Sequence, residues 1–420
     1  MSTRPSRAVN SVLAALRTWA ATGLLIVLLG VLLTSPPIVF LGVATILVRV
    51  LGERWPRRVL ESLDYQHTIK PSRTVVGEDV ELTMSLWNRS RLPVAWAGVQ
   101  ETLGPALRVS GREGSVASLG IAGPMRPYER LSRRIQISAV RRGVHDVGPA
   151  RVRVAEIFGS GDPGRDPEIA PALLIARPLS VPLVGAPPAS APLAQSRARR
   201  SLFHDPALFA GTRPFQAGDP IRSIHWRASA RVATLQAKRY EPTLSRQHVL
   251  VFDVQTIEGE FWELVYDEQL FEDQCVAALS LARSLVAEET AVGFAAAGFT
   301  GTTQRYVYLP PRADSSQIGR IGDALARLGM ESSAALVALL ATLPLRVARG
   351  TTLVVLTGRS PLSNIAVVRR LAQSGFAVHF LVMPEAHDSL VDAHRAGLSA
   401  QAIRVQRERR IPRAVLITAA

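Results

Sequence analysis

The chain of 420 residues contains very little cysteine and lysine, and each shortage limits what it can be. Cys275 is the only cysteine, so no disulfide can form within the chain, which fits a reducing compartment. Lys70 and Lys238 are the only lysines, so the net charge of +15 comes almost entirely from arginine. Because a GC-rich genome produces the same bias, we expect no nucleic-acid partner. A basic surface would still favour anionic lipid headgroups or acidic partners.

Catalytic motifs are also missing from the sequence. It has no Gly-x-Ser-x-Gly, no phosphate loop and no His-x-x-x-His pair. An enzymatic reading would combine His225 with Asp219 or Asp205 and use Ser229 as nucleophile. Members of a catalytic triad usually come from separate elements and are recognised by geometry, so closeness in sequence is weak support. We therefore expect no enzymatic activity and no cofactor.

Residues 1–60 contain a long uncharged run, from Thr18 to Val48, which would measure about 46 Å as one helix. A bilayer core is only about 30 Å thick, and Ser35-Pro36-Pro37 interrupts the run. The pattern predicts two short membrane spans, roughly 13–34 and 38–51, that turn back at the prolines. A hairpin places both basic flanks on one side, which the positive-inside rule makes cytoplasmic, together with the bulk of the chain. The flanks hold Arg4, Arg7, Arg17, Arg49, Arg54, Arg57 and Arg58.

Two other interpretations of this run stay open. A secretory signal peptide would need a shorter apolar region and a small-residue cleavage site. A single kinked or tilted span is the second, since the second half of the run is short and ends on Arg49. That interpretation leaves the orientation undefined.

Residues 61–158 have apolar side chains at every second position, which predicts a small antiparallel β-sandwich. Val80, Leu82, Met84 and Leu86 are the clearest example. His67 and His145 are isolated in sequence, and we interpret both as ordinary strand or turn residues. Residues 159–200 are rich in Pro, Ala and Gly and predict a connector, with one possible strand over 172–176. Its cluster of Arg197, Arg199 and Arg200 is interpreted as a solvated charge run, with contact to an acidic partner or a membrane as the alternative.

Residues 201–246 gather Arg, Asp, His and Trp in one short segment. Asp219-Pro220 predicts a helix start and a helix to about Ala230, with Asp219 as its cap. Its apolar stripe would be Ile221, Ile224, His225 and Ala228, and its arginines would lie mostly elsewhere. The structural interpretation of His225 and Trp226 is that the imidazole and the indole N–H bond to neighbouring backbone and anchor the segment against the α/β domain, and we favour it for Trp226. The candidates for partner binding are Arg213, Asp219, Arg222, His225, Trp226, Arg227 and Arg231. For Arg222, Arg227 and Arg231, structural pairing with carboxylates is the alternative.

Residues 247–420 alternate short apolar strands with amphipathic helices. Strands are predicted at 248–254, 291–298, 306–309, 351–357 and 377–383, with helices between them. This order predicts a mainly parallel sheet with helices on both faces. In such sheets, binding sites lie beyond the carboxyl ends of the strands.

The segment from Arg213 through Gly218-Asp219-Pro220 and Ile224-His225-Trp226 to Lys238 resembles the signature of a bacterial membrane protein family, "domain of unknown function 58". The resemblance covers most of the chain. It implies an N-terminal transmembrane hairpin, an all-β, Ig-like sandwich and a C-terminal α/β, Rossmann-like domain similar to a von Willebrand factor A domain. It also implies association with a cytosolic AAA+ ATPase of the MoxR type, and it brings no established activity.

A von Willebrand A domain would bring Mg²⁺, held by an Asp-x-Ser-x-Ser loop and by a Thr and an Asp from later loops, all hard oxygen ligands. Here Gln255 and Ile257 stand where the serines would be, and the Thr357–Ser360 loop has no carboxylate. Asp253 alone matches, so it is a weak metal candidate, with Thr256 as a second ligand. We expect a domain that has lost its metal.

The sequence therefore predicts a membrane-anchored interaction protein that docks a protein partner. Two alternatives stay open: a metal-dependent adhesion domain outside the cell, and a binder of anionic lipid or nucleic acid that uses the arginines.

Overall fold

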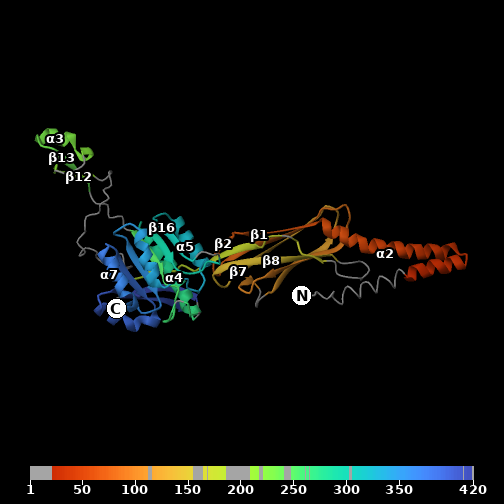
Figure 1. Ribbon diagram of the computed structural model, residues 1–420. Helices are drawn as coiled ribbons and strands as arrows, with labels where there is room; N and C mark the ends of the chain where they lie inside the picture. The colour runs from red at the N-terminus through yellow and green to blue at the C-terminus, as the bar shows by residue number, and fades with distance from the viewer. Residues whose placement is uncertain are drawn as a thin grey trace. The chain divides into compact units, whose positions relative to one another are not determined.

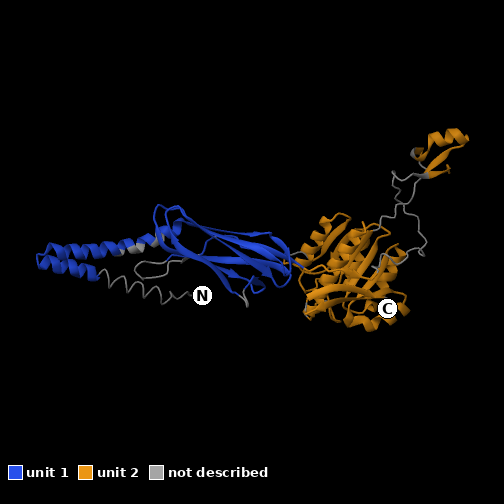
Figure 2. Ribbon diagram, turned by 180° about the vertical axis from the view of Figure 1, so that it is seen from behind, with its two compact units in different colours: residues 1–177 blue, residues 178–420 orange. Residues whose placement is uncertain are grey.

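The chain divides into two compact units, Met1–Arg177 and Pro178–Ala420, which Figure 2 shows in blue and orange. The structure is a computed structural model (Figure 1). It describes residues 21–111, 116–154, 164–167, 169–185, 209–216, 221–240, 247–260, 262–263, 265–301, 305–409 and 411–418.

Unit 1 begins with a helical hairpin made by residues 21–32 and by α2, Pro36–Ser62 (Figure 1). The turn lies where the double proline predicts it. Thr34 has a φ of 50°, and Pro36 starts α2, where a missing N–H costs no helical hydrogen bond. Glycines let the two helices approach closely: a Cβ on Gly30 would lie 2.6 Å from Val39 N.

The second helix is longer than the predicted span, which was drawn to end at residue 51. It begins at Pro36 and continues to Ser62, past the exposed Arg54 and Arg58. The predicted end followed the first charged residues, but arginine is a good helix former and does not end a helix. Within the part of the chain that the structure describes, we find no helix with the length and apolar character needed to cross a membrane. Residues 13–20 of the first predicted span lie outside that part.

Two β-sheets share one hydrophobic core in the rest of unit 1. The first has the order β1-β3-β7-β5 and the second the order β2-β10-β8-β4-β6, with β9 beside β8. The strands are β1 Leu63–Lys70, β2 Arg73–Val75, β3 Asp79–Asn88, β4 Val94–Leu103, β5 Leu107–Val109, β6 Ser118–Met125, β7 Arg130–Ala139, β8 Gly143–Val154, β9 Gly164–Arg165 and β10 Ala172–Arg177. The predicted alternation is confirmed on β3, where Val80, Leu82, Met84 and Leu86 are fully buried.

The β-domain extends past the boundary expected at residue 158. The strand predicted over 172–176 is present as β10, and it pairs with both β8 and β2 rather than lying in a connector. The Pro, Ala and Gly around it concealed the pairing, because only the short run Leu173-Leu174-Ile175 marks a strand in the sequence. The arginine cluster 197–200 lies outside the described residues.

Unit 2 is built on an eight-stranded sheet with the order β11-β20-β19-β18-β17-β14-β15-β16. The five strands from β15 to β19 in this order are parallel, while β16 and β20 run antiparallel to their neighbours β15 and β19. The strands are β11 Leu183–Val184, β14 Gln247–Phe252, β15 Ala291–Ala296, β16 Val307–Arg312, β17 Thr352–Thr357, β18 Ala377–Val382, β19 Ser399–Glu408 and β20 Ile411–Thr418. All five predicted strands are confirmed, whereas the hairpin of β19 and β20 was not predicted.

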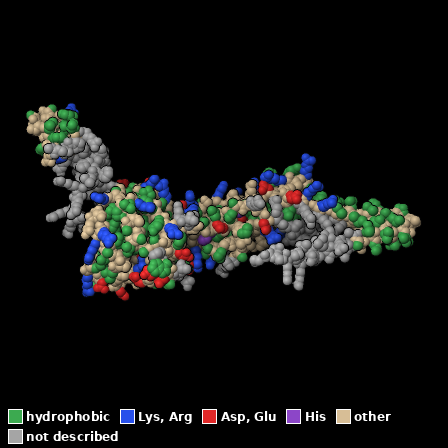
Figure 3. All heavy atoms as spheres, viewed as in Figure 1, with side chains coloured by type: hydrophobic (Ala, Val, Ile, Leu, Met, Phe, Trp, Pro, Cys, Tyr) green, Lys and Arg blue, Asp and Glu red, His purple; other side chains and the backbone are tan. Residues whose placement is uncertain are grey.

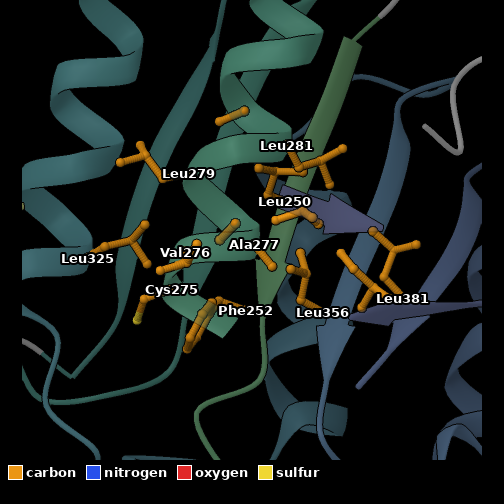
Figure 4. Close-up of a cluster of buried hydrophobic side chains, with 14 of the residues drawn as sticks. Leu250, Phe252, Cys275, Val276, Ala277, Leu279, Leu281, Leu325, Leu356 and Leu381 are labelled. Atoms are coloured by element: carbon orange, nitrogen blue, oxygen red, sulfur yellow. The ribbon is translucent and has the colours of Figure 1, made fainter. Parts of the chain in front are cut away.

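Helices cover both faces of this sheet, as predicted. One face packs against α4 (Glu268–Ala287) and α5 (Ser316–Arg327) in a core that includes Phe252 and Cys275 (Figure 4). The other packs against α6 (Leu336–Thr342), α7 (Ile365–Gln373) and α8 (Leu390–Arg395). Because β14 and β17 are buried on both faces, their carboxyl ends are held rigidly at one edge of the sheet.

Candidate functional site

The segment 209–240, here called the signature module, forms a small unit with its own two-stranded sheet. β12 (Phe209–Pro214) pairs antiparallel with β13 (Gln236–Tyr240). Between them lie a short 3₁₀ helix, Ile221–Ser223, and α3, Trp226–Val232. Residues 217–220 are outside the described chain.

A chain of hydrogen bonds fixes α3 against β13. His225 caps the helix, with its Nδ1 accepting the Ala228 N–H at 3.1 Å, and its own N–H donates to the Gln236 carbonyl at 2.7 Å. The buried Ser229 hydroxyl donates to the His225 carbonyl at 3.1 Å and accepts the Gln236 N–H at 2.9 Å. His225 and Ser229 thus hold main-chain groups together, and for His225 this is the bonding to neighbouring backbone that its structural interpretation expects.

The structure corrects the helix predicted over 220–230. The helix begins at Trp226, because His225 rather than Asp219 caps it. Ile224 is buried as expected, whereas Ile221, which belonged to the same predicted stripe, is 74% exposed in the 3₁₀ turn. A change from one helix to two short ones puts residues three apart on different faces.

The predicted partner-binding residues fall into three groups. Trp226, Arg227 and Arg231 are exposed on α3, and the Trp226 side chain, at 66% exposed, is not packed as a structural anchor would be. Arg213 lies half-buried on β12, where its Nη1 donates to the Pro214 carbonyl at 3.1 Å. Asp219 and the side chain of Arg222 lie outside the described structure.

A second polar site lies at the carboxyl edge of the large sheet. Asp253 follows β14 and is 3% exposed, and its N–H donates to the Leu356 carbonyl of β17 at 3.0 Å. Thr357 ends β17, and its hydroxyl donates to Asp253 Oδ2 at 2.8 Å. Arg359 approaches the same carboxylate, with Nη2 at 3.1 Å from Oδ1 and 3.0 Å from Oδ2 and with Nε at 3.2 Å from Oδ2.

Burial and neighbouring groups shift the pKa of Asp253 in opposite directions. Burial raises the pKa of Asp253 above its usual range, while Arg359 and Thr357 work against that rise by favouring the carboxylate. The Arg359 side chain is only 11% exposed, so the two charges neutralise each other away from bulk water. Arg359 was not predicted, because nothing in the sequence separates it from the other surface arginines.

The residues at this edge do not fit the metal that the resemblance implies. Asp253 already accepts from Arg359 and Thr357. The Thr256 hydroxyl accepts the Asp267 N–H at 2.8 Å, and the Ser360 hydroxyl accepts the Leu362 N–H. Across the described residues, no three His, Cys, Asp or Glu side chains come together as metal ligands. An arginine stands against the one carboxylate where a cation would be needed.

His67 also has a partner that the sequence did not reveal. It lies on β1 with a side chain 5% exposed, and its Nδ1 meets Oε1 of the fully buried Glu101 on β4. Tyr65 donates to Glu101 Oε2 at 2.7 Å, and His67 Nε2 lies 3.1 Å from the Ala170 carbonyl. The interpretation of His67 as an ordinary strand residue is therefore wrong. Strand spacing could have flagged it, since 65 and 67 share the inward face of β1.

Hydrogen bonding with Glu101 raises the pKa of His67, against a smaller lowering by burial. Burial and Glu101 both raise the pKa of Tyr65. His145 lies on β8 and its Nε2 contacts the Arg141 carbonyl at 2.8 Å, as an ordinary strand residue can.

Comparison with known proteins gives one family match. No curated protein matches the chain. Among solved structures, the CARDB domain of the PF1109 protein from Pyrococcus furiosus, in complex with di-metal ions, is similar at 14% identity over 28% of this chain and 94% of that chain. Its TM-score of 0.18 supports no argument about fold or function. Residues 211–360 match the family described as "Protein of unknown function DUF58". The matched stretch is about a third of the chain, and it includes most of the signature module and the Asp253–Arg359 pair.

Proposed function

We propose that the protein is a membrane-anchored docking protein without enzymatic activity, which binds a MoxR-type AAA+ ATPase through the signature module and a von Willebrand A-like domain. The observation that carries the proposal is the surface of the signature module. Two apolar side chains on or beside α3, Trp226 and Val232, are at least 60% exposed, next to the exposed Arg227 and Arg231. Tryptophan and arginine are the residues most enriched at the energetic centres of protein interfaces.

The rest of the module supports this reading. Ile221 and Leu235 are also at least half exposed. A unit of two strands and one short helix has little interior, so burying these side chains would require a second surface. The identity of the partner rests on the family resemblance alone.

The loop between β14 and α4, in the α/β domain, has a second exposed apolar surface. Ile257, Trp262, Val265 and Tyr266 are all at least 40% exposed there. In a chain that is strongly basic, residues 253–273 hold no Lys or Arg and eight acidic residues: Asp253, Glu258, Glu260, Glu263, Asp267, Glu268, Glu272 and Asp273. A partner with a basic face would complement this loop.

The hairpin supports the membrane anchor. Its apolar side chains point outward rather than into a protein core, and Figure 3 shows them covering its surface. In the hairpin, the exposed large apolar residues are Leu24, Leu25, Leu28, Leu29, Val31, Leu32, Leu33, Phe40, Leu41, Val43, Leu47, Val48, Val50 and Leu51. Water is a poor solvent for such a surface, whereas lipid chains are a good one. The exposed Arg54 and Arg58 farther along α2 suit a cytoplasmic lipid surface.

Co-purification tests the docking. The full chain, tagged at its C-terminus, is extracted gently from membranes, and bound proteins are identified for wild type and for Trp226→Ala combined with Arg231→Ala. The variant should retrieve at least tenfold less ATPase, because losing an interface Trp commonly costs more than 2 kcal/mol. Val391→Ala with Arg395→Ala is the matched control, since it removes an exposed apolar residue and an exposed arginine from α8. Equal ATPase recovery from all three chains would disprove docking through the module.

Topology tests the anchor separately. A C-terminal reporter that works only in the cytoplasm should be active, and one that works only outside it should be silent. The opposite result would favour the adhesion alternative. Recovery of the full chain in the soluble fraction after lysis, without detergent, would argue against the anchor itself.

A further inference from the structure

The Asp253–Arg359 pair lies at the carboxyl edge of the large sheet, where the resemblance to a von Willebrand A domain would place a divalent cation. We infer that the Arg359 guanidinium is a built-in replacement for that cation, so that the domain is independent of divalent metal, and that removing Arg359 opens a latent Mg²⁺ or Mn²⁺ site. The inference does not depend on the proposed docking function.

Position is the first argument. Asp253 and Thr357 stand at the carboxyl ends of β14 and β17, which are adjacent parallel strands whose last paired residues are Phe252 and Leu356. This is the edge at which open α/β sheets place their ligands. The carboxylate and the hydroxyl are 2.8 Å apart, so two hard oxygens already converge there.

Glu258, in the loop after β14, binds the backbone that follows Arg359. Glu258 Oε1 accepts the Ser360 N–H at 2.6 Å, which holds a second carboxylate one residue along the chain from Arg359. The Asp253 carboxylate and the Thr357 hydroxyl are hard oxygen donors of the kind that Mg²⁺ or Mn²⁺ binds, and water would complete the coordination once Arg359 is removed. Arg359 takes the position beside Asp253 that an ion would need.

The contacts of Arg359 close that position. The Asp253 carboxylate accepts three contacts from the Arg359 fork and one from Thr357, and the Gln255 backbone N–H adds a further hydrogen bond. Its roughly four lone-pair sites are therefore all used. The guanidinium is largely removed from water, so it is not a surface arginine that happens to reach inward. A metal ion would have to displace a buried, bidentate cation.

Thermal unfolding of the full chain tests the inference, in EDTA and in Mg²⁺ or Mn²⁺ at matched ionic strength. The wild type should unfold at the same temperature in all three conditions. Arg359→Ala should unfold at a lower temperature in EDTA and regain roughly 5–10 °C at a metal concentration about 100 times its Kd. Arg359→Lys is the matched control: it keeps a cation beside Asp253 and should show no metal response.

Three results would overturn the inference. A wild-type unfolding temperature that rises with Mn²⁺ and stops rising in Asp253→Asn would mean that a metal binds despite Arg359. Arg359→Ala without any metal response would mean that no latent site exists. A metal response of Arg359→Ala that survives Asp253→Asn would place the metal elsewhere.

Direct binding covers the case in which Arg359→Ala does not fold. Electron paramagnetic resonance of Mn²⁺ with wild-type protein should detect no bound ion that depends on Asp253. Arg359→Gln, which keeps part of the side chain and one amide donor but no charge, should bind one Mn²⁺ per chain. Binding to wild type that is lost in Asp253→Asn, or no binding to Arg359→Gln, would contradict the inference.

Discussion

Two buried carboxylates, one in each unit, are neutralised by different kinds of cation. Asp253 in the α/β domain is held by Arg359, which stays protonated at any pH that the protein meets. Glu101 in the β-domain is held by His67, whose charge depends on pH. Each carboxylate also accepts one hydroxyl, from Thr357 or from Tyr65. The buried carboxylate thus has a permanently charged partner in the α/β domain and a titratable partner in the β-domain.

The geometry around His67 shows which form the β-domain prefers. Its Nδ1 faces a carboxylate and its Nε2 faces the Ala170 carbonyl, and both of these groups can only accept hydrogen bonds. A protonated imidazole donates to both, whereas a neutral one leaves a lone pair facing an acceptor. The stability of the β-domain should therefore depend on the charge of His67 and hence on pH. The α/β domain instead has a cation, Arg359, whose charge is fixed.

The largest expected effect is that of Arg359→Ala, which leaves Asp253 buried without a cation. The free energy of unfolding of the α/β domain should fall by about 3–5 kcal/mol near neutral pH. Arg359→Lys keeps the charge but loses the bidentate fork, so its free energy of unfolding should fall by less. Denaturant unfolding monitored through unit 2 measures both; a loss within error of zero for Arg359→Ala would show that the pair contributes nothing.

The pH dependence of that loss has a definite sign. In Arg359→Ala the rise that burial causes in the pKa of Asp253 is no longer opposed by the guanidinium. The folded variant then takes up a proton more readily than the unfolded chain, so its deficit relative to wild type should shrink as the pH is lowered. A deficit that is constant from pH 5 to 8 would contradict this.

A middle-sized effect with the opposite trend is expected for His67→Gln. Because the pKa of His67 is raised in the folded protein, its stabilisation is complete below the ordinary value of about 6.5 and is lost as the pH rises through the raised pKa. The variant should lose about 1.5–3 kcal/mol at pH 6, and the loss should fade at higher pH. Denaturant unfolding of unit 1 across pH 6–9 tests this. His145→Gln is the control on β8, and an equal effect there would break the comparison.

The smallest effects should come from the two hydroxyl donors. Tyr65→Phe and Thr357→Val should each cost about 1 kcal/mol, because each carboxylate keeps its cation. Thr357→Ser retains the hydroxyl and should recover most of its loss. If removing either hydroxyl lowers stability as much as removing the corresponding cation, the carboxylates are stabilised mainly by hydrogen bonding. The difference between arginine and histidine would then explain little of the stability.

Much of the architecture could be predicted, because it follows from local patterns. Alternation on β3 and the apolar runs of β14 and β17 each depend on nearby residues alone. The double-proline turn is equally local. The less certain parts have weaker signals. β10 was predicted, but it lies among prolines and was assigned to a connector, and β19 and β20, which were not predicted, mix charged with apolar residues.

The candidate sites could be predicted only in part, because ion pairs join distant residues. Asp253 was identifiable from its place after a buried strand, but its partner is 106 positions away and is one of many arginines. His67 and Glu101 are 34 positions apart on different sheets. Such pairs form only when the fold brings distant segments together, and no local spacing in the sequence specifies that.

The replacement of a metal by Arg359 is tested most directly by anomalous diffraction from crystals of the full chain grown with Mn²⁺. In Arg359→Ala we predict a peak about 2.1 Å from an Asp253 carboxylate oxygen, a typical distance for a small divalent cation. In wild type we predict Arg359 in contact with Asp253 and no peak between them. A peak beside Asp253 in wild-type crystals, with the arginine turned away, would contradict the account.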